Sequence, residues 1–425
     1  MPNHDTCFHT IRFPLKSIHN NLLFLTVLLT FLLASEQKND QYVLLISFDG
    51  FRADYLDWYD TPNFDRFSKN GVRASGMKPS FVTKTFPNHY SIATGMYVEN
   101  HGLIGNKFYD QQLDDYYTLR ERDKVEDARF YDGEPIWVTA EKQGVKAASF
   151  FWVGSEAPIG SVYPSRWKRY DHGFPFIGRI DSIVQWFALP ILERPRLCLL
   201  YFHQPDATGH DFGPRSPETE AMVIKMDSLF GVLIKKTSEL EIYPQLNIIA
   251  VSDHGMAEIS SDRTVNLSKH TNMGAIIHEG TDPYAMLYSE NKAEVEKAVI
   301  ALKKVPHISV YLKNEIPDRF HFKNHYRIKD ALVLADEGWY INNQAISTSS
   351  TAGAYVHTGG THGYDNDLKS MHAIFLAQGP AFKINYSSSV INNIDIYPLI
   401  AHILKLEPFS GIDGKLENVQ GLLKQ

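Results

Sequence analysis

Five short apolar runs recur along the chain, and polar residues, glycine or proline bound each of them. The runs are rich in Val, Ile, Leu and Phe and show little alternation with polar positions, which is typical of strands buried on both faces. They cover residues 42–48, 146–152, 196–203, 246–252 and 372–378. Helix-like patterns at 61–70, 134–143 and 217–237 lie between them. The alternation predicts an α/β fold with a mostly parallel central sheet flanked by helices.

Acidic residues follow three of these predicted strands. Asp49 follows the first strand, Asp206 lies just beyond the third, and Asp253 with His254 follows the fourth. In a parallel sheet, active sites gather at the carboxyl ends of the strands. The sequence therefore predicts one site that these residues share.

The stretch 256–357 has a looser pattern. It contains one clear helical pattern at 291–304 and short strand-like runs at 284–288, 308–312 and 332–335. We interpret this stretch as an insertion or cap within a catalytic domain that spans residues 41–415. Residues 416–425 are expected to form a C-terminal tail.

The N-terminus carries an uncharged apolar run, LLFLTVLLTFLLA, at 22–34. Arg12 and Lys16 precede it, and its length suits a signal-peptide core better than a bilayer span of about 20 residues. We expect residues 1–35 to be a signal peptide of a secreted or extracellular protein. An uncleaved signal anchor is the alternative, and only then is membrane attachment expected. Acceptor sequons at Asn266 and Asn385 fit a glycoprotein on this route.

Composition narrows the possible partners. The 425 residues include 42 basic and 49 acidic side chains, and the net charge of −7 does not favour binding to a nucleic-acid polymer. Of the two cysteines, Cys7 lies in the expected leader and Cys198 lies in an apolar run. We therefore expect Cys198 to be a buried structural thiol. The sequence does not indicate an oligomeric state.

Aspartate and histidine residues recur with spacings that suit metal binding. Asp206 and His210 are four apart and can face the same way on one helical turn. Taken singly, Asp49 is better explained as a helix N-cap, and Asp206 and His210 as surface residues. Together, the candidates form a set of three carboxylates and three imidazoles. The set consists of Asp49, Asp206, His210, Asp253, His254 and His362. Two zinc ions with three protein ligands each would suit this mixed set and leave positions for Thr85, water and substrate.

Six motifs occur in order along the chain: FDGFRADYL (48–56), TKTFPNHYSIATG (83–95), HGLIGNKFYD (101–110), PDATGH (205–210), SDHGM (252–256) and THGYDN (361–366). Together they resemble the motifs of the ectonucleotide pyrophosphatase/phosphodiesterase family, within the alkaline phosphatase superfamily. The resemblance covers about residues 42–410 and is closest to the short members that consist of the catalytic domain alone. It implies an alkaline phosphatase-like fold and a hydrolase of phosphoric diester and anhydride bonds.

The resemblance also implies roles for the candidate residues. Asp206, His210 and His362 would hold one zinc ion. Asp49, Asp253 and His254 would hold the other zinc ion, to which the Thr85 hydroxyl binds. Thr85 would form a covalent phospho-threonine that water then hydrolyses, and Asn106 would donate a hydrogen bond to a non-bridging oxygen. From the residues alone, a turn position beside Gly105 is the simpler explanation of Asn106.

The expected substrates are extracellular nucleotides, from which nucleoside 5′-monophosphates would be released. Phe86 could stack on a nucleobase, although a generic Phe is more often part of a core. A second aromatic residue would come from 163–170, where Trp167 is closest to the family's stacking tyrosine and Tyr170 is next. Lys84, the basic residue beside Thr85, is the remaining substrate-binding candidate. Cleavage of lysophospholipid or choline-phosphate esters, and a non-catalytic role in surface binding, are the alternatives.

Overall fold

The structure is a computed structural model that describes residues 2, 40–280, 283–342 and 358–424. Of the expected leader at 1–35, only Pro2 belongs to the described residues. Within the described ranges, no helix has the length and apolar character needed to span a bilayer. Residues 41–425 form one compact unit, which carries the fold and the site described below.

A central sheet of eight strands, in the order β19-β2-β18-β9-β1-β8-β6-β7, organises this unit. Its strands are β1 (Tyr42–Phe48), β2 (Val72–Ala74), β6 (Ala147–Phe150), β7 (Arg166–Lys168), β8 (Leu197–Phe202), β9 (Leu246–Val251), β18 (Phe375–Gln378) and β19 (Tyr386–Ser388). All pairs are parallel except those of β18, which runs antiparallel to both β2 and β9. The predicted mostly parallel sheet is confirmed, and the five apolar runs correspond to β1, β6, β8, β9 and β18.

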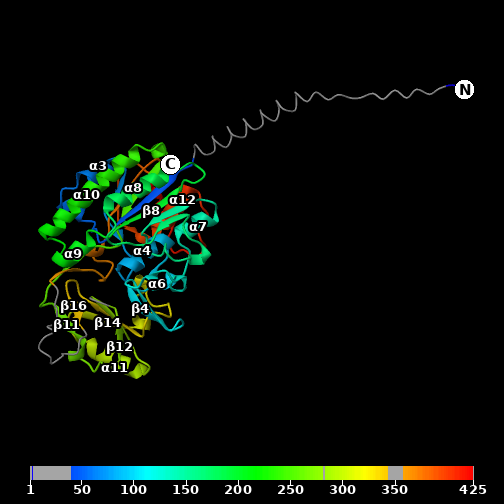
Figure 1. Ribbon diagram of the computed structural model, residues 1–425. Helices are drawn as coiled ribbons and strands as arrows, with labels where there is room; N and C mark the ends of the chain where they lie inside the picture. The colour runs from blue at the N-terminus through cyan, green and yellow to red at the C-terminus, as the bar shows by residue number, and fades with distance from the viewer. Residues whose placement is uncertain (1, 3–39, 281–282, 343–357, 425) are drawn as a thin grey trace. The chain divides into compact units, whose positions relative to one another are not determined.

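Helices cover both faces of the sheet (Figure 1). One face carries α3 (Pro62–Lys69), α8 (Phe176–Phe187) and α10 (Pro217–Ser238), and the other carries α4 (Thr85–Thr94), α7 (Ile136–Lys142) and α12 (Ile396–Leu404). Successive side chains of a strand point to opposite faces, so Leu44 and Ile46 join the first layer while Val43 and Leu45 join the second. This double burial explains why the β1 sequence is continuously apolar.

The insertion forms a second, smaller sheet, at the lower part of Figure 1. Its four antiparallel strands, in the order β12-β13-β15-β14, are β12 (Ile277–Glu279), β13 (Tyr284–Tyr288), β15 (Ala331–Ala335) and β14 (Ile308–Leu312). Helix α11 (Lys292–Leu302) packs on this sheet, and the Asn291 side chain caps it by accepting a hydrogen bond from the Ala293 N–H. Residues 343–357 of the expected insertion lie outside the described residues.

Shorter elements complete the unit. They are α2 (Tyr55–Trp58), β3 (Met77–Lys78), α5 (Val98–His101), the hairpin of β4 (Lys107–Asp110) and β5 (Asp115–Thr118), α6 (Arg122–Val125), α9 (Asp206–Phe212), β10 (Ala257–Ile259), β11 (Thr264–Asn266), β16 (Tyr340–Asn342), β17 (Gly359–Thr361) and β20 (Ile391–Asn392). The expected C-terminal tail contains two 3-10 turns, Leu416–Asn418 and Gln420–Leu422. Val419 and Leu422 are buried in the main core, although their neighbours in the sequence are polar. Burial of their apolar side chains holds the turns against the rest of the unit.

Candidate active site

Asp49, Asp253 and His254 form the first of two groups of metal-ligating side chains. Asp49 follows β1, and Asp253 and His254 come just after β9, its parallel neighbour, so the strand ends bring the three together. The Nε2 atom of His254 lies 2.9 Å from Asp253 Oδ2 and 3.5 Å from Asp49 Oδ1. All three residues are buried.

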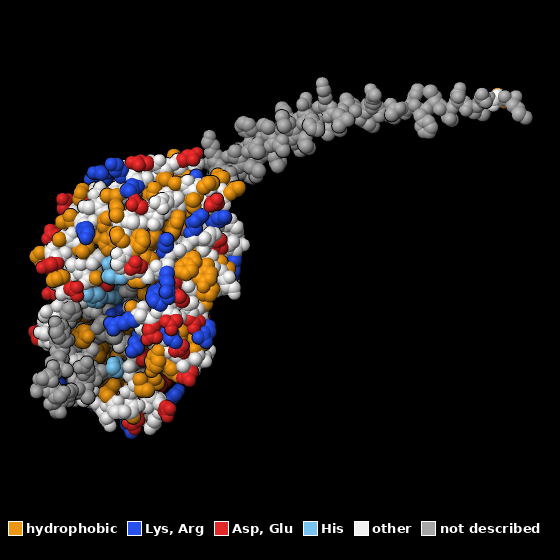
Figure 2. Space-filling model, viewed as in Figure 1, with side chains coloured by type: hydrophobic (Ala, Val, Ile, Leu, Met, Phe, Trp, Pro, Cys, Tyr) orange, Lys and Arg blue, Asp and Glu red, His pale blue; other side chains and the backbone are white. Residues whose placement is uncertain are grey.

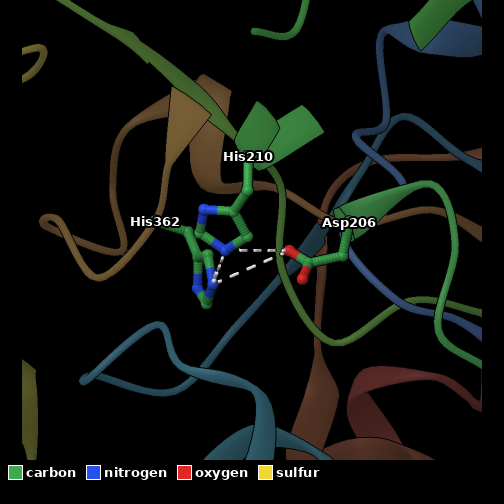
Figure 3. Close-up of side chains that lie close together, drawn as sticks. All are labelled: Asp206, His210 and His362. Atoms are coloured by element: carbon green, nitrogen blue, oxygen red, sulfur yellow. Dashed lines mark hydrogen bonds and ion pairs between the residues drawn. The ribbon is translucent and has the colours of Figure 1, made fainter. Parts of the chain in front are cut away.

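Asp206, His210 and His362 form the second group (Figure 3). Asp206 and His210 lie one turn apart on α9, which follows β8, and His362 follows β17. The Nε2 atoms of the two histidines are 3.1 Å apart, and they lie 3.5 Å (His210) and 3.7 Å (His362) from Asp206 Oδ1. Figure 2 shows a small group of histidine side chains, coloured pale blue, on the left part of the visible face.

The hydrogen bonds of the three imidazoles fix which ring nitrogen is available. Each Nδ1 lies within hydrogen-bond distance of a backbone carbonyl oxygen, which can only accept, so each Nδ1 carries the proton that it donates. The pairs are His210 with Gly360 O (2.8 Å), His254 with Gly255 O (2.8 Å) and His362 with Thr83 O (2.7 Å). In the neutral rings the Nε2 lone pairs therefore face one another and the carboxylates, an arrangement that is repulsive unless a cation lies between them.

In both Asp49 and Asp253, one carboxylate oxygen accepts a hydrogen bond and the other has no donor among the described residues. Asp49 Oδ2 accepts a hydrogen bond from the Tyr201 hydroxyl at 2.6 Å, and Asp253 Oδ1 accepts one from the Gly50 N–H at 3.1 Å. The second oxygen of each, together with Asp206 Oδ1, is buried without a hydrogen-bond partner. Buried carboxylate oxygens without donors are costly unless they bind a metal ion, so both groups fit such ions.

The pKa shifts of Asp49 and His362 point the same way. Burial, and then the neighbouring carboxylates of Asp253 and Asp206, raise the pKa of Asp49 well above its usual value. Burial also lowers the pKa of His362 well below its usual value, with His254, Lys84 and His210 adding to the effect. His362 therefore stays neutral, as a metal ligand must, while the crowded carboxylates require a positive charge that a metal ion would supply.

Thr85 is the first residue of α4, and its Oγ1 lies 3.2 Å from His254 Nε2. Asn106 lies close by, because its Oδ1 accepts a hydrogen bond from the Phe86 N–H at 3.0 Å. That bond orients the amide so that its Nδ2 hydrogens remain for another acceptor. Both residues line one cavity together with members of both metal groups.

This cavity has a volume of about 250 Å³ and an aromatic wall. Phe86 and Tyr170 line it, as do Phe151 and Trp152. Trp167 does not: it lies in β7 at the sheet edge, where its ring stacks on Tyr163 with centroids 5.3 Å apart. Of the two aromatic candidates from 163–170, the structure thus brings Tyr170 to the cavity.

Lys84 also stays outside the cavity lining. It immediately precedes α4, is 4% exposed and lies beside Gly363, next to the candidate ligand His362. Its charge therefore adds to the positive potential near the second metal group.

Sequence reasoning did not identify three polar residues of the cavity. One is Tyr201, the donor to Asp49. The others are Arg122 and Glu156, which form an ion pair in the cavity wall, with Glu156 Oε1 also accepting a hydrogen bond from the Tyr170 N–H at 3.1 Å. Their contacts join residues far apart in the chain or at irregular spacing, so no local pattern pointed to them.

Comparison with known proteins decides the family. The sequence model of the type I phosphodiesterase / nucleotide pyrophosphatase family matches residues 43–365. The chain belongs to this family. The expected family and enzyme class are thereby confirmed, and all six candidate metal ligands lie within the matched range.

Several relatives support the assignment. The chain is 38% identical over 394 residues to the human bis(5′-adenosyl)-triphosphatase ENPP4, which covers 91% of this chain and 83% of the relative. It is 36% identical over 390 residues to a venom phosphodiesterase of Naja atra, which covers 89% of this chain but only 46% of the relative. The chain thus spans about half the length of the venom enzymes that it matches.

A solved structure agrees with the fold. The structure of murine ENPP5, an inactive variant in complex with AMP, superposes with a TM-score of 0.84 at 35% identity, and the match covers 91% of this chain and all (100%) of that chain. The expected alkaline phosphatase-like fold of the short family members is consistent with this match.

Proposed function

We propose that this protein hydrolyses phosphodiester and pyrophosphate bonds of extracellular nucleotides and releases nucleoside 5′-monophosphates. The proposal rests chiefly on Thr85, whose hydroxyl oxygen is 3.2 Å from His254 Nε2 and faces the aromatic cavity that both metal groups border. The name of ENPP4 as a bis(5′-adenosyl)-triphosphatase and the AMP bound to murine ENPP5 support a nucleotide substrate.

Two zinc ions are the cofactors that we propose. Asp49, Asp253 and His254 would hold one ion, and Asp206, His210 and His362 the other. When bound, the ions would supply positive charge that lowers the pKa of the attacking hydroxyl and of water and that neutralises phosphate oxygens. Three imidazoles among six ligands favour zinc over magnesium or calcium.

The chain's own residues would carry the reaction in two displacements. In the first, Thr85 Oγ gives up its proton to solvent and attacks phosphorus, an Oγ–P bond forms, and the bond to the leaving oxygen breaks as that oxygen takes the electron pair. In the second, water attacks the phosphorus of the resulting threonine–nucleotide diester, the Oγ–P bond breaks, one proton of the water passes to Thr85 Oγ, and the nucleoside 5′-monophosphate is released. The N-terminus of α4 and the Asn106 Nδ2 donor favour the negative charge of the non-bridging oxygens.

The substrate's base would lie between Phe86 and Tyr170, since both rings line the cavity. Trp167, the first candidate from the sequence, is replaced by Tyr170 in this proposal because its ring is engaged with Tyr163. Lys84 would act through its charge rather than through direct contact.

The secretory route is part of the proposal. The apolar run at 22–34 would direct export, and Asn385, which is exposed before β19, would accept a glycan together with Asn266. A mobility shift on treatment with a glycosidase, absent after Asn385→Gln and Asn266→Gln, would test this point.

The direct test combines metal analysis with product analysis of the purified protein. We expect zinc in the protein, release of 5′-monophosphate from the nitrophenyl ester of a nucleotide, and, after acid quenching, a Thr85 peptide that carries the nucleotide on its Oγ. Thr85→Ala should abolish the last two of these three readouts. Thr94→Ala is the matched control, because its hydroxyl bonds the Tyr90 carbonyl at 2.7 Å within the same helix and lies outside the cavity lining.

An inactive wild type after reconstitution with zinc would exclude this function. Cleavage of a choline-phosphate ester in preference to nucleotide esters would favour the lipid-directed alternative instead.

A further inference from the structure

Arg327 of the insertion is buried, with 1% of its side chain exposed, and its guanidinium reaches into the catalytic domain. Nε donates to Asp110 Oδ2 at 2.5 Å, NH1 donates to the Gly102 and Phe130 carbonyls, both at 2.8 Å, and NH2 donates to the Arg129 carbonyl at 3.1 Å. A planar guanidinium with fixed donor directions can hold several acceptors in one arrangement.

These acceptors belong to one segment, residues 102–130, which forms a side of the cavity. The segment carries Asn106, and it also supplies Leu119, Arg122 and Val125 to the cavity wall. Gly102 is its first residue, Asp110 ends strand β4 of its hairpin, and Phe130 is its last. A single side chain of the insertion thus joins the beginning, the hairpin and the end of the segment.

The approach of Arg327 to Gly102 leaves no room for a side chain. Gly102 has a φ of +72°, and a Cβ atom there would lie 2.7 Å from Arg327 NH1. Glycine adopts this left-handed conformation without steric cost. Glycine at position 102 therefore allows the Arg327 guanidinium to reach the backbone at the start of the segment.

Two neighbours of Arg327 attach the same hairpin. The Tyr326 hydroxyl donates to Asp110 Oδ2 at 2.6 Å, and the buried Lys329 ammonium donates to the Tyr109 carbonyl at 2.8 Å. Glu279 of β12 accepts a hydrogen bond from the Tyr109 N–H at 3.2 Å. The insertion therefore holds strand β4, which begins directly after Asn106, by both its backbone and a buried carboxylate.

We infer that Arg327 is a positioning residue for the reaction: it fixes the segment 102–130 so that Asn106 keeps its place relative to Thr85. This inference rests on the proposed function and gives the insertion a role in it. Asn106 lies four residues from each of Gly102 and Asp110, two of the acceptors of Arg327, so a loosened attachment moves its amide. Displacements of about 1 Å can lower a rate by about 100-fold.

The test is a double-mutant cycle between Arg327→Lys and Asn106→Ala, with zinc content measured on every variant. Lysine keeps the charge but loses the planar fork. We expect Arg327→Lys to lower kcat by about tenfold or more, and Asn106→Ala to lower it by about 100-fold to 1,000-fold. The double variant should be no slower than Asn106→Ala alone, because Arg327 acts through Asn106.

Arg319→Lys is the matched control. Arg319 is also an insertion arginine that pairs with carboxylates of the catalytic domain, Asp365 and Asp367, but its side chain is 43% exposed. We expect its kcat and zinc content to equal those of the wild type. Asp110→Asn, which preserves shape at the other end of the Arg327 bond, replaces Arg327→Lys in the cycle if the lysine variant does not fold.

Multiplicative loss of kcat in the double variant, or loss of zinc in Arg327→Lys, would overturn the inference and make Arg327 a residue of general stability. Amide hydrogen exchange gives a readout that does not depend on activity. Exchange should quicken within 102–130 and stay unchanged in β1 and β8 of Arg327→Lys. An inactive wild type would refute the proposed function, and the exchange measurement would still decide the attachment.

Discussion

Tyr201 gives the sharpest prediction about the metal groups. Its hydroxyl donates to Asp49 Oδ2 at 2.6 Å, Tyr201 is 8% exposed, and Asp49 is 2% exposed. In Tyr201→Phe this oxygen loses its donor in a place that water hardly reaches. A hydrogen bond to a charged group contributes about 1.5–3 kcal/mol, and 1.4 kcal/mol corresponds to a factor of ten. We therefore expect the zinc dissociation constant of the group that contains Asp49 to rise by about 10-fold to 100-fold.

The same change also alters the pH dependence of metal binding. The Tyr201 hydrogen bond lowers the pKa of Asp49, against the burial that raises it. Its loss raises this pKa further, and a protonated carboxylate does not bind metal. The pH at which half the protein holds metal should therefore move upward in Tyr201→Phe, by about 1–2 units if the whole hydrogen-bond energy is lost.

Competition with a chromophoric chelator over a range of pH measures both effects. Tyr397→Phe is the control, because it removes a buried hydroxyl that bonds Thr139 Oγ1 at 2.6 Å and accepts from the Phe409 N–H at 3.1 Å, on α12 and away from the metal groups. Equal zinc affinities of Tyr201→Phe and wild type would refute the reasoning. Equal weakening in both variants would attribute the effect to general loss of packing.

Three further outcomes follow from the structure. Phe86→Ala and Tyr170→Ala should each raise KM for a nucleotide ester by about tenfold, since stacking on a base contributes about 1–3 kcal/mol, whereas Trp167→Ala should leave KM unchanged. Steady-state kinetics with base-containing and base-free diesters measure these KM values. Burial lowers the pKa of His101 to about 3, so below pH 6.5 only the unfolded chain takes up that proton. Stability should then fall by up to about 1.4 kcal/mol per pH unit between about pH 6 and pH 3, and denaturant titrations should show a shallower fall in His101→Gln. Gly50→Ala should weaken metal binding by at least about tenfold in a chelator competition. Gly50 has a φ of +66°, and a Cβ atom there would lie 2.8 Å from the Cα of Asp206, a candidate metal ligand on α9.

The elements that the sequence predicted well carry local signals. Strand β1 coincides with its apolar run, because burial on both faces leaves no polar position inside it. Helix α10 begins at the residue expected from the chain, since Ser216 accepts a hydrogen bond from the Thr219 N–H and Pro217 occupies the first helical position. The candidate ligands Asp49 and Asp253 could be grouped because parallel neighbours end at the same edge of a sheet.

Other features carry no local signal. The direction of Trp167 depends on how the edge strand β7 pairs with β6, because a shift of one residue would turn its side chain to the other face, and Tyr170 lies beyond the end of this strand. Val419 and Leu422 join the core because of what lies beside them, not because of their neighbours in sequence. The same holds for Arg327, whose acceptor Asp110 is 217 residues away.

The sequence by itself determined the layers of the fold, the chemical types of the candidate metal ligands and the threonine beside them, because periodic burial and strand ends are properties of short stretches. Only the tertiary structure decided which ring nitrogens face the carboxylates, which aspartate oxygens are left without donors, and which aromatic ring lines the cavity. Each of these depends on the relative placement of segments that are far apart in the chain. Hydrogen bonds are sensitive to distances of a few tenths of an ångström, and it is the packing of the whole domain that sets those distances.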